Sequence, residues 1–130
     1  MKRISFVGLV LFVVLSMAAG VYADVDKEGI KNQVDEIVVA INGGAKAEDF
    51  ADAAKKEPYY VFIMEEDGKM LVHPSLVGES LKEKAEPVYN ALTAATPEGL
   101  WVDYEWKGKM KHTYARKTAG GLIVASGYSD

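Results

Sequence analysis

Positions 59–74 read Tyr-Tyr-Val-Phe-Ile-Met-Glu-Glu-Asp-Gly-Lys-Met-Leu-Val-His-Pro, and this pattern predicts a β-hairpin. Residues 59–65 are rich in aromatic and β-branched side chains and too apolar for a sheet edge, so we expect a strand buried on both faces. Asp67-Gly68 predicts a tight turn. Residues 69–73 then form the returning strand, which Pro74 ends.

The elements on either side of this hairpin complete the predicted fold. Apolar residues at helical spacing predict a helix over residues 26–42, which the Gly43-Gly44 pair ends. A short helix is expected over residues 49–56, and another begins near Pro87. Three further strands are predicted at 100–107, 110–118 and 122–128. The sequence therefore predicts an α+β fold, with a five-stranded antiparallel sheet and a long N-terminal helix.

The first 23 residues have the features of a signal peptide. Lys2 and Arg3 precede an apolar run that is shorter than a membrane span, and small residues lead to a cleavage site after Ala23. We therefore expect an exported, periplasmic protein, with residues 24–130 forming a single domain. An uncleaved N-terminal anchor is the alternative.

Charge and composition exclude several classes of function. The 130-residue chain has no cysteine and two histidines, which excludes thiol chemistry and leaves little for a metal site. From Asp24 onward 19 acidic and 13 basic residues give a net charge of −6, which disfavours nucleic acid and anionic membranes as partners. Residues 106–118 nevertheless hold five basic residues and no acid. This segment either marks an anion site or forms a solvated edge strand protected by lysines.

Several short motifs, in this order, resemble one known family. They are Tyr-Val-Phe-Ile-Met at 60–64, Asp-Gly-Lys-Met-Leu-Val-His-Pro at 67–74, Leu-Val-Gly-Glu-Ser-Leu at 76–81, Gly-Leu-Trp-Val-Asp-Tyr-Glu-Trp at 99–106, Lys111 before Tyr114, and Leu-Ile-Val-Ala-Ser-Gly-Tyr at 122–128. Together they resemble the Cache domain family, and more narrowly its single-Cache, type 2 sensor domains.

The resemblance implies a PAS-like fold, in which a long helix covers one face of the sheet and a ligand pocket lies on the other. Cache domains usually form the periplasmic sensing part of chemoreceptors and histidine kinases, and they often bind short carboxylates. This sequence departs from that pattern because it ends at Asp130 without a signalling domain, so we expect a stand-alone form. It is also short between Trp106 and Lys111, where relatives often carry a longer loop.

The candidate ligand-binding residues lie mainly on the last three strands. Tyr104 and Trp106 share one strand face, and their rings, with a basic side chain, suit a small anion in a partly apolar pocket. The turn decides which basic residue joins them. A Gly108-Lys109 turn places Lys111 opposite Trp106. A three-residue turn instead places Met110 there and turns three other side chains toward the rings: His112, Tyr114 and Arg116.

His73, at the end of the returning strand, is a further candidate donor for a carboxylate, although a lone histidine is often structural. The predicted ligand-binding residues are His73, Tyr104, Trp106, Lys111, Tyr114 and Arg116. No cofactor or metal is expected. No nucleophile–base pair stands out either, so we do not expect an enzyme.

Two functions remain open at this stage. The first is a periplasmic sensory or binding domain that captures a small organic anion and presents it to a membrane sensor kinase, chemoreceptor or transporter. The second is a ligand-free adaptor that docks on an envelope protein. A cavity lined by Tyr104, Trp106 and a basic residue favours the first, whereas a pocket filled by side chains favours the second.

Overall fold

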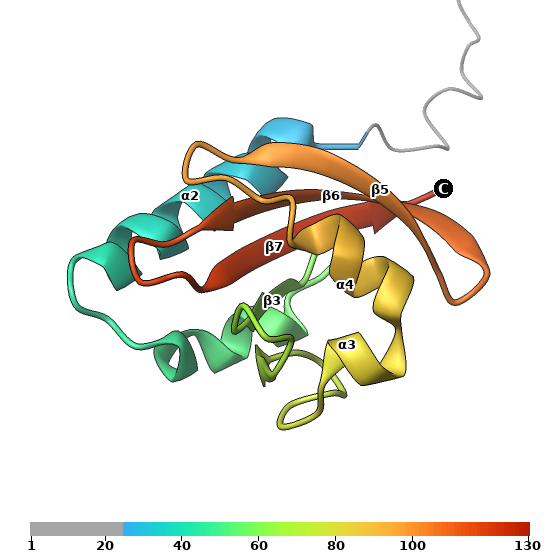
Figure 1. The fold of residues 1–130 in the computed structure, drawn as a ribbon. Helices are drawn as coiled ribbons and strands as arrows, with labels where there is room; N and C mark the ends of the chain where they lie inside the picture. The colour runs from blue at the N-terminus through green and yellow to red at the C-terminus, as the bar shows by residue number, and fades with distance from the viewer. Residues whose placement is uncertain (1–24) are drawn as a thin grey trace, which may run out of the picture.

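The computed structural model describes residues 25–130, so the predicted signal peptide (residues 1–23) lies outside the described part of the chain. Five strands form one sheet, and helices lie on both of its faces (Figure 1). The elements in chain order are α2 (Lys27–Asn42), the 3₁₀ helix η1 (Ala47–Lys55), β3 (Val61–Met64), β4 (Met70–Val72), α3 (Leu81–Lys84), α4 (Glu86–Leu92), β5 (Leu100–Trp106), β6 (Lys109–Lys117) and β7 (Ile123–Ser129). No helix among them is long and apolar enough to cross a membrane.

The sheet has the strand order β4-β3-β7-β6-β5, with every neighbouring pair antiparallel. This confirms the predicted α+β fold and the five-stranded antiparallel sheet. It also confirms that β3 is buried on both faces, since it lies between β4 and β7 and all four of its residues are buried. Gly68, at φ +102°, occupies the predicted turn between β3 and β4.

Helix α2 covers one face of the sheet, over β6 and β7. It begins at the N-cap Asp26, whose side chain accepts a hydrogen bond from Gly29 N, and it ends before Gly43, as predicted. Its apolar stripe, formed by Ile30, Val34, Ile37 and Val38, packs on the sheet and forms the first core cluster.

The short helices α3 and α4 cover the opposite face, where a second core cluster forms (Figure 1). Ser80 caps α3 by accepting from Glu83 N, and Pro87 lies in the first turn of α4, as its fixed φ favours. Each layer of the protein therefore has its own core, and the side-chain alternation of the strands decides which residues enter which core.

The β5–β6 hairpin turns at Lys107-Gly108, which neither predicted turn anticipated. Both residues have positive φ, +54° and +81°, as a two-residue type I′ turn requires. Tyr104 therefore pairs with Lys111, and Trp106 pairs with Lys109. Because β6 lies between β5 and β7, the interpretation of its basic residues as those of an edge strand is wrong.

Gly127 provides a test of the packing between β6 and β7. A Cβ at this position would meet the His112 carbonyl oxygen and the Thr113 side chain, whereas a Cβ at Gly120 would meet nothing. We expect Gly127→Ala to lower the free energy of unfolding by about 1–3 kcal/mol. Gly120→Ala should leave it nearly unchanged. Chemical denaturation of both variants measures this, and equal stabilities would contradict the described packing.

Candidate functional site

A pocket lies between the sheet and helices α3 and α4, on the face opposite α2. Its walls enclose about 220 Å³, solvent at the mouth included. The lining residues are Tyr60, Phe62, Met70, His73, Leu81, Val88, Leu92, Tyr104, Trp106 and Lys111. Four of the six predicted ligand-binding residues therefore share one pocket: His73, Tyr104, Trp106 and Lys111.

Among the described residues, Lys111 is the only lysine or arginine that lines the pocket, and it is deeply buried, at 4% relative exposure. Its Nζ donates a hydrogen bond to the Tyr60 hydroxyl at 2.8 Å and lies 4.3 Å from the centroid of the same ring. None of the ion pairs among residues 25–130 includes Lys111. Burial, with a smaller contribution from the nearby Lys107, lowers the pKa of Lys111 to about 8. The pocket thus holds a cationic group without a carboxylate partner in the described chain.

His73 is fixed in one tautomer by the backbone amides that follow it in the chain. Its Nδ1 accepts hydrogen bonds from Ser75 N and Leu76 N, at 3.0 and 3.1 Å. Since a nitrogen that accepts carries no proton, the neutral ring is protonated at Nε2, which makes Nε2 a donor. Burial and then the charges of Lys111 and Lys107 lower the pKa of His73 to about 4. His73 is therefore a neutral donor near pH 7.

Aromatic side chains form the rest of the polar wall. The Tyr104 hydroxyl accepts from Thr113 Oγ1 at 2.9 Å, and burial raises the pKa of Tyr104 well above its usual value. The ring of Trp106 meets His73 edge-on, with centroids 6.3 Å apart. Because burial also raises the pKa of Tyr60, both tyrosines keep their protons at neutral pH.

This arrangement suits one kind of ligand. Amine, imidazole, phenol and indole groups supply hydrogen-bond donors, and no carboxylate of residues 25–130 lines the pocket. Side chains from β3, β4, α3 and α4 supply an apolar floor: Phe62, Met70, Leu81, Val88 and Leu92. Within residues 25–130, no group of three or more His, Cys, Asp or Glu side chains is placed to hold a metal ion. Chemically, the lining offers a cationic group and hydrogen-bond donors beside an apolar floor.

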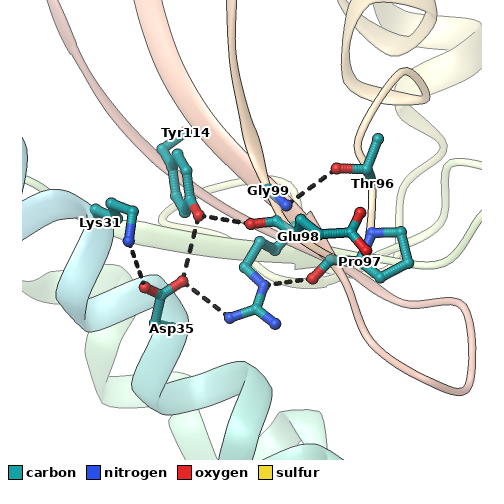
Figure 2. Close-up of polar contacts among 8 residues, drawn as sticks. Lys31, Asp35, Thr96, Pro97, Glu98, Gly99 and Tyr114 are labelled. Atoms are coloured by element: carbon teal, nitrogen blue, oxygen red, sulfur yellow. Dashed lines mark hydrogen bonds and ion pairs between the residues drawn. The ribbon is translucent and has the colours of Figure 1, made fainter.

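The two remaining predicted residues, Tyr114 and Arg116, do not reach this pocket. Successive residues of a strand point to opposite faces, so the observed register turns both toward α2. There Arg116 Nη1 donates to Asp35 at 3.0 Å, and the Tyr114 hydroxyl donates to Glu98 O at 3.1 Å and to Asp35 at 3.4 Å (Figure 2). Their observed contacts tie the helix to the sheet.

Lys31 completes this polar cluster from the same helix, with its Nζ 3.1 Å from the other oxygen of Asp35 (Figure 2). Burial alone would raise the pKa of Asp35, but the hydrogen bonds from Arg116 and Lys31 hold it below its usual value. The ionised carboxylate thus stabilises the fold, and this contribution is lost as the pH falls through the lowered pKa.

Sequence reasoning missed two polar contributors to the pocket. Tyr60 lies in the segment 59–65 that the sequence predicts to be buried on both faces, yet it is only partly buried and accepts a hydrogen bond from the Lys111 amine. Its period-two spacing from Phe62 could have indicated a shared face. Lys107 lies in the turn, and its charge acts on both Lys111 and His73. The position of Lys107 next to these two residues follows only from the observed register of the hairpin.

Comparison with known proteins supports the fold. No family model matches the sequence, and no curated protein matches it. The chain is similar to the crystal structure of a methyl-accepting chemotaxis protein from Vibrio parahaemolyticus RIMD 2210633, with a TM-score of 0.55 and 15% identity over 78% of this chain and 84% of that one. This likeness shows the fold alone, which is the PAS-like α+β fold that the sequence predicted.

Two further solved structures match less fully. One is the extracellular domain of the putative histidine kinase mmHK1S-Z2, with a TM-score of 0.46 and 18% identity. The match covers 63% of this chain and 36% of that one. The other is the ligand-binding domain of Mlp24 with asparagine, with a TM-score of 0.45 and 15% identity. The match covers 65% of this chain and 35% of that one. The chain spans about a third of the length of each.

The polar cluster at Asp35 gives a testable prediction about stability. Asp35→Ala leaves the half-buried Arg116 without its carboxylate, so we expect it to lower the free energy of unfolding by about 1–3 kcal/mol at pH 7. Lys31→Ala removes an exposed partner from the same carboxylate and should have a much smaller effect. Denaturant titrations at pH 7 and pH 3 measure both. The difference between Asp35→Ala and wild type should shrink at pH 3, and a pH-independent difference would contradict the role of the charge.

Proposed function

We propose that this chain is a sensory ligand-binding domain whose pocket takes a small organic anion, most simply a short carboxylate. The single observation that carries the proposal is the buried amine of Lys111, which faces a pocket without a carboxylate partner in the described chain. An ammonium group in an apolar site costs free energy unless an opposite charge compensates it. A bound carboxylate would supply that charge.

The other polar groups fit the same ligand. His73 offers a neutral N–H and the tyrosines offer hydroxyls, so a carboxylate could accept several hydrogen bonds while Lys111 balances its charge. The apolar floor would contact the rest of the ligand. This division of polar and apolar walls is typical of ligand pockets.

The size of the pocket favours a small ligand. Its free volume of about 10 Å³ is roughly the space for one water molecule, far below the roughly 300–1,000 Å³ of pockets for drug-sized molecules. Binding of even a short carboxylate would therefore move lining side chains, of which Tyr60, His73 and Trp106 are only partly buried.

The cellular context is part of the proposal. The signal-peptide features of residues 1–23 support export to the periplasm. A membrane sensor kinase, chemoreceptor or transporter would then read the bound state. The alternative is a ligand-free adaptor, which a pocket filled by side chains favours, and the small free volume of about 10 Å³ fits it. The lining by Tyr104, Trp106 and Lys111 supports ligand binding instead.

A thermal-shift screen tests the proposal. At 100 times its dissociation constant, a bound ligand stabilises a fold by about 2.7 kcal/mol, which corresponds to a rise in Tm of about 10 °C or more for a domain of this size. We expect acetate, propionate or a related short carboxylate to give this rise with wild type. Lys111→Met should abolish it. Lys109→Met, which removes the same charge from an exposed position on the same strand, should retain it.

The pH dependence gives the screen a second readout. The amine of Lys111 is charged below its pKa of about 8, so carboxylate binding should weaken as the pH rises through that value. In the absence of ligand, Lys111→Met should be at least as stable as wild type at pH 7, because it removes a buried charge. A folded Lys111→Met that still responds to carboxylates, or a wild type that responds to none, would contradict the proposal.

A further inference from the structure

The surroundings of the buried Lys111 amine suit a neutral, nucleophilic amine as well as a charged one. Three other lysines of residues 25–130 form ion pairs with carboxylates: Lys31, Lys84 and Lys117. Lys111 has only a phenol as its hydrogen-bond partner in residues 25–130. Near pH 7 its lowered pKa leaves about a tenth of the amine neutral, roughly 300 times more than for a lysine with the ordinary value of 10.5.

Tyr60 lies where a proton-transfer group would be needed. Its hydroxyl is 2.8 Å from Nζ, so it can donate its proton to the carbonyl oxygen as the amine attacks, and the phenolate formed can then take a proton from the nitrogen. Its raised pKa keeps it protonated, and therefore an acid, at the start of the reaction. His73 and Tyr104 lie on the same pocket wall and remain available to hold a carboxylate.

We infer that the pocket captures a 2-oxo acid covalently, as a reversible imine between its carbonyl carbon and Nζ of Lys111. The inference rests on the proposed function and narrows its ligand class, because the carboxylate would occupy the anion site and place the adjacent carbonyl beside the amine. A plain aldehyde lacks the carboxylate that the His73 N–H would bind.

The reaction is balanced without any further reactant. The lone pair of neutral Nζ forms a bond to the carbonyl carbon, and the carbonyl oxygen takes up a proton. The resulting carbinolamine loses its hydroxyl group with a second proton as water, and a C=N bond remains. Addition of water reverses these steps and releases the ligand unchanged, so the site captures without turnover.

Reductive trapping tests the inference. The full-length protein is incubated with pyruvate, treated with borohydride and analysed by intact mass and peptide mapping. We expect a single adduct on Lys111, with the mass of pyruvic acid less one oxygen atom. Lactate, which has no carbonyl group, should give none. Lys111→Arg retains the charge and should give no adduct at this site, whereas Lys109→Arg should behave as wild type.

The pH profile separates capture from simple anion binding. Trapping should speed up as the pH rises from 6 toward 8, because the neutral amine increases, while the binding of acetate weakens over the upper part of that range. If pyruvate and acetate both raise Tm but Lys111 is not labelled, the imine is excluded and the proposed function stands. If neither raises Tm and no adduct forms, both fail. Labelling spread over exposed lysines, with no preference for Lys111, would also overturn the inference.

Discussion

The two-residue turn at Lys107-Gly108 fixes the register of the β5–β6 hairpin, and the pocket depends on that register. With Tyr104 opposite Lys111, the amine enters the face covered by α3 and α4. The same register sends Arg116 to the face covered by α2, where it pairs with Asp35. A shift of one residue would exchange the two faces and place the guanidinium in the pocket. This one turn thus places Lys111 in the candidate site and Arg116 in the contacts that join α2 to the sheet.

Burial of the charged Lys111 amine lowers the stability of the fold, and the proposed ligand binding accounts for why it is there. The apolar surroundings that lower its pKa make the charged amine unfavourable in the folded protein, and within the described part of the chain only the Tyr60 hydroxyl and the nearby aromatic rings compensate this cost. A hydrophobic side chain would pack there at no such cost. An unpaired buried charge is therefore more simply explained by a ligand than by folding. The cluster at Asp35 differs, since its charges satisfy one another within the protein.

Much of the fold could be predicted from sequence, because its signals are local. The apolar run and Asp-Gly turn of the β3–β4 hairpin, and the stripe of α2, each lie within one segment. The register could not be predicted, because Lys107 adopts a left-handed conformation that non-glycine residues rarely favour. The ion pair between Asp35 and Arg116 joins residues 81 positions apart, which no local sequence pattern reveals. The three-residue turn that would bring Tyr114 and Arg116 to the pocket face is not the turn observed, in which Trp106 pairs with Lys109.

The most direct test of the central claim is an NMR titration of the Lys111 side chain, with its signal assigned by comparison with Lys111→Arg. In the protein without added ligand, we expect the amine to titrate near pH 8. Saturating acetate should raise that pKa, because a bound carboxylate stabilises the charged form. An amine that titrates near its ordinary value of 10.5 without ligand, or a lowered pKa that no small carboxylate changes, would contradict the account.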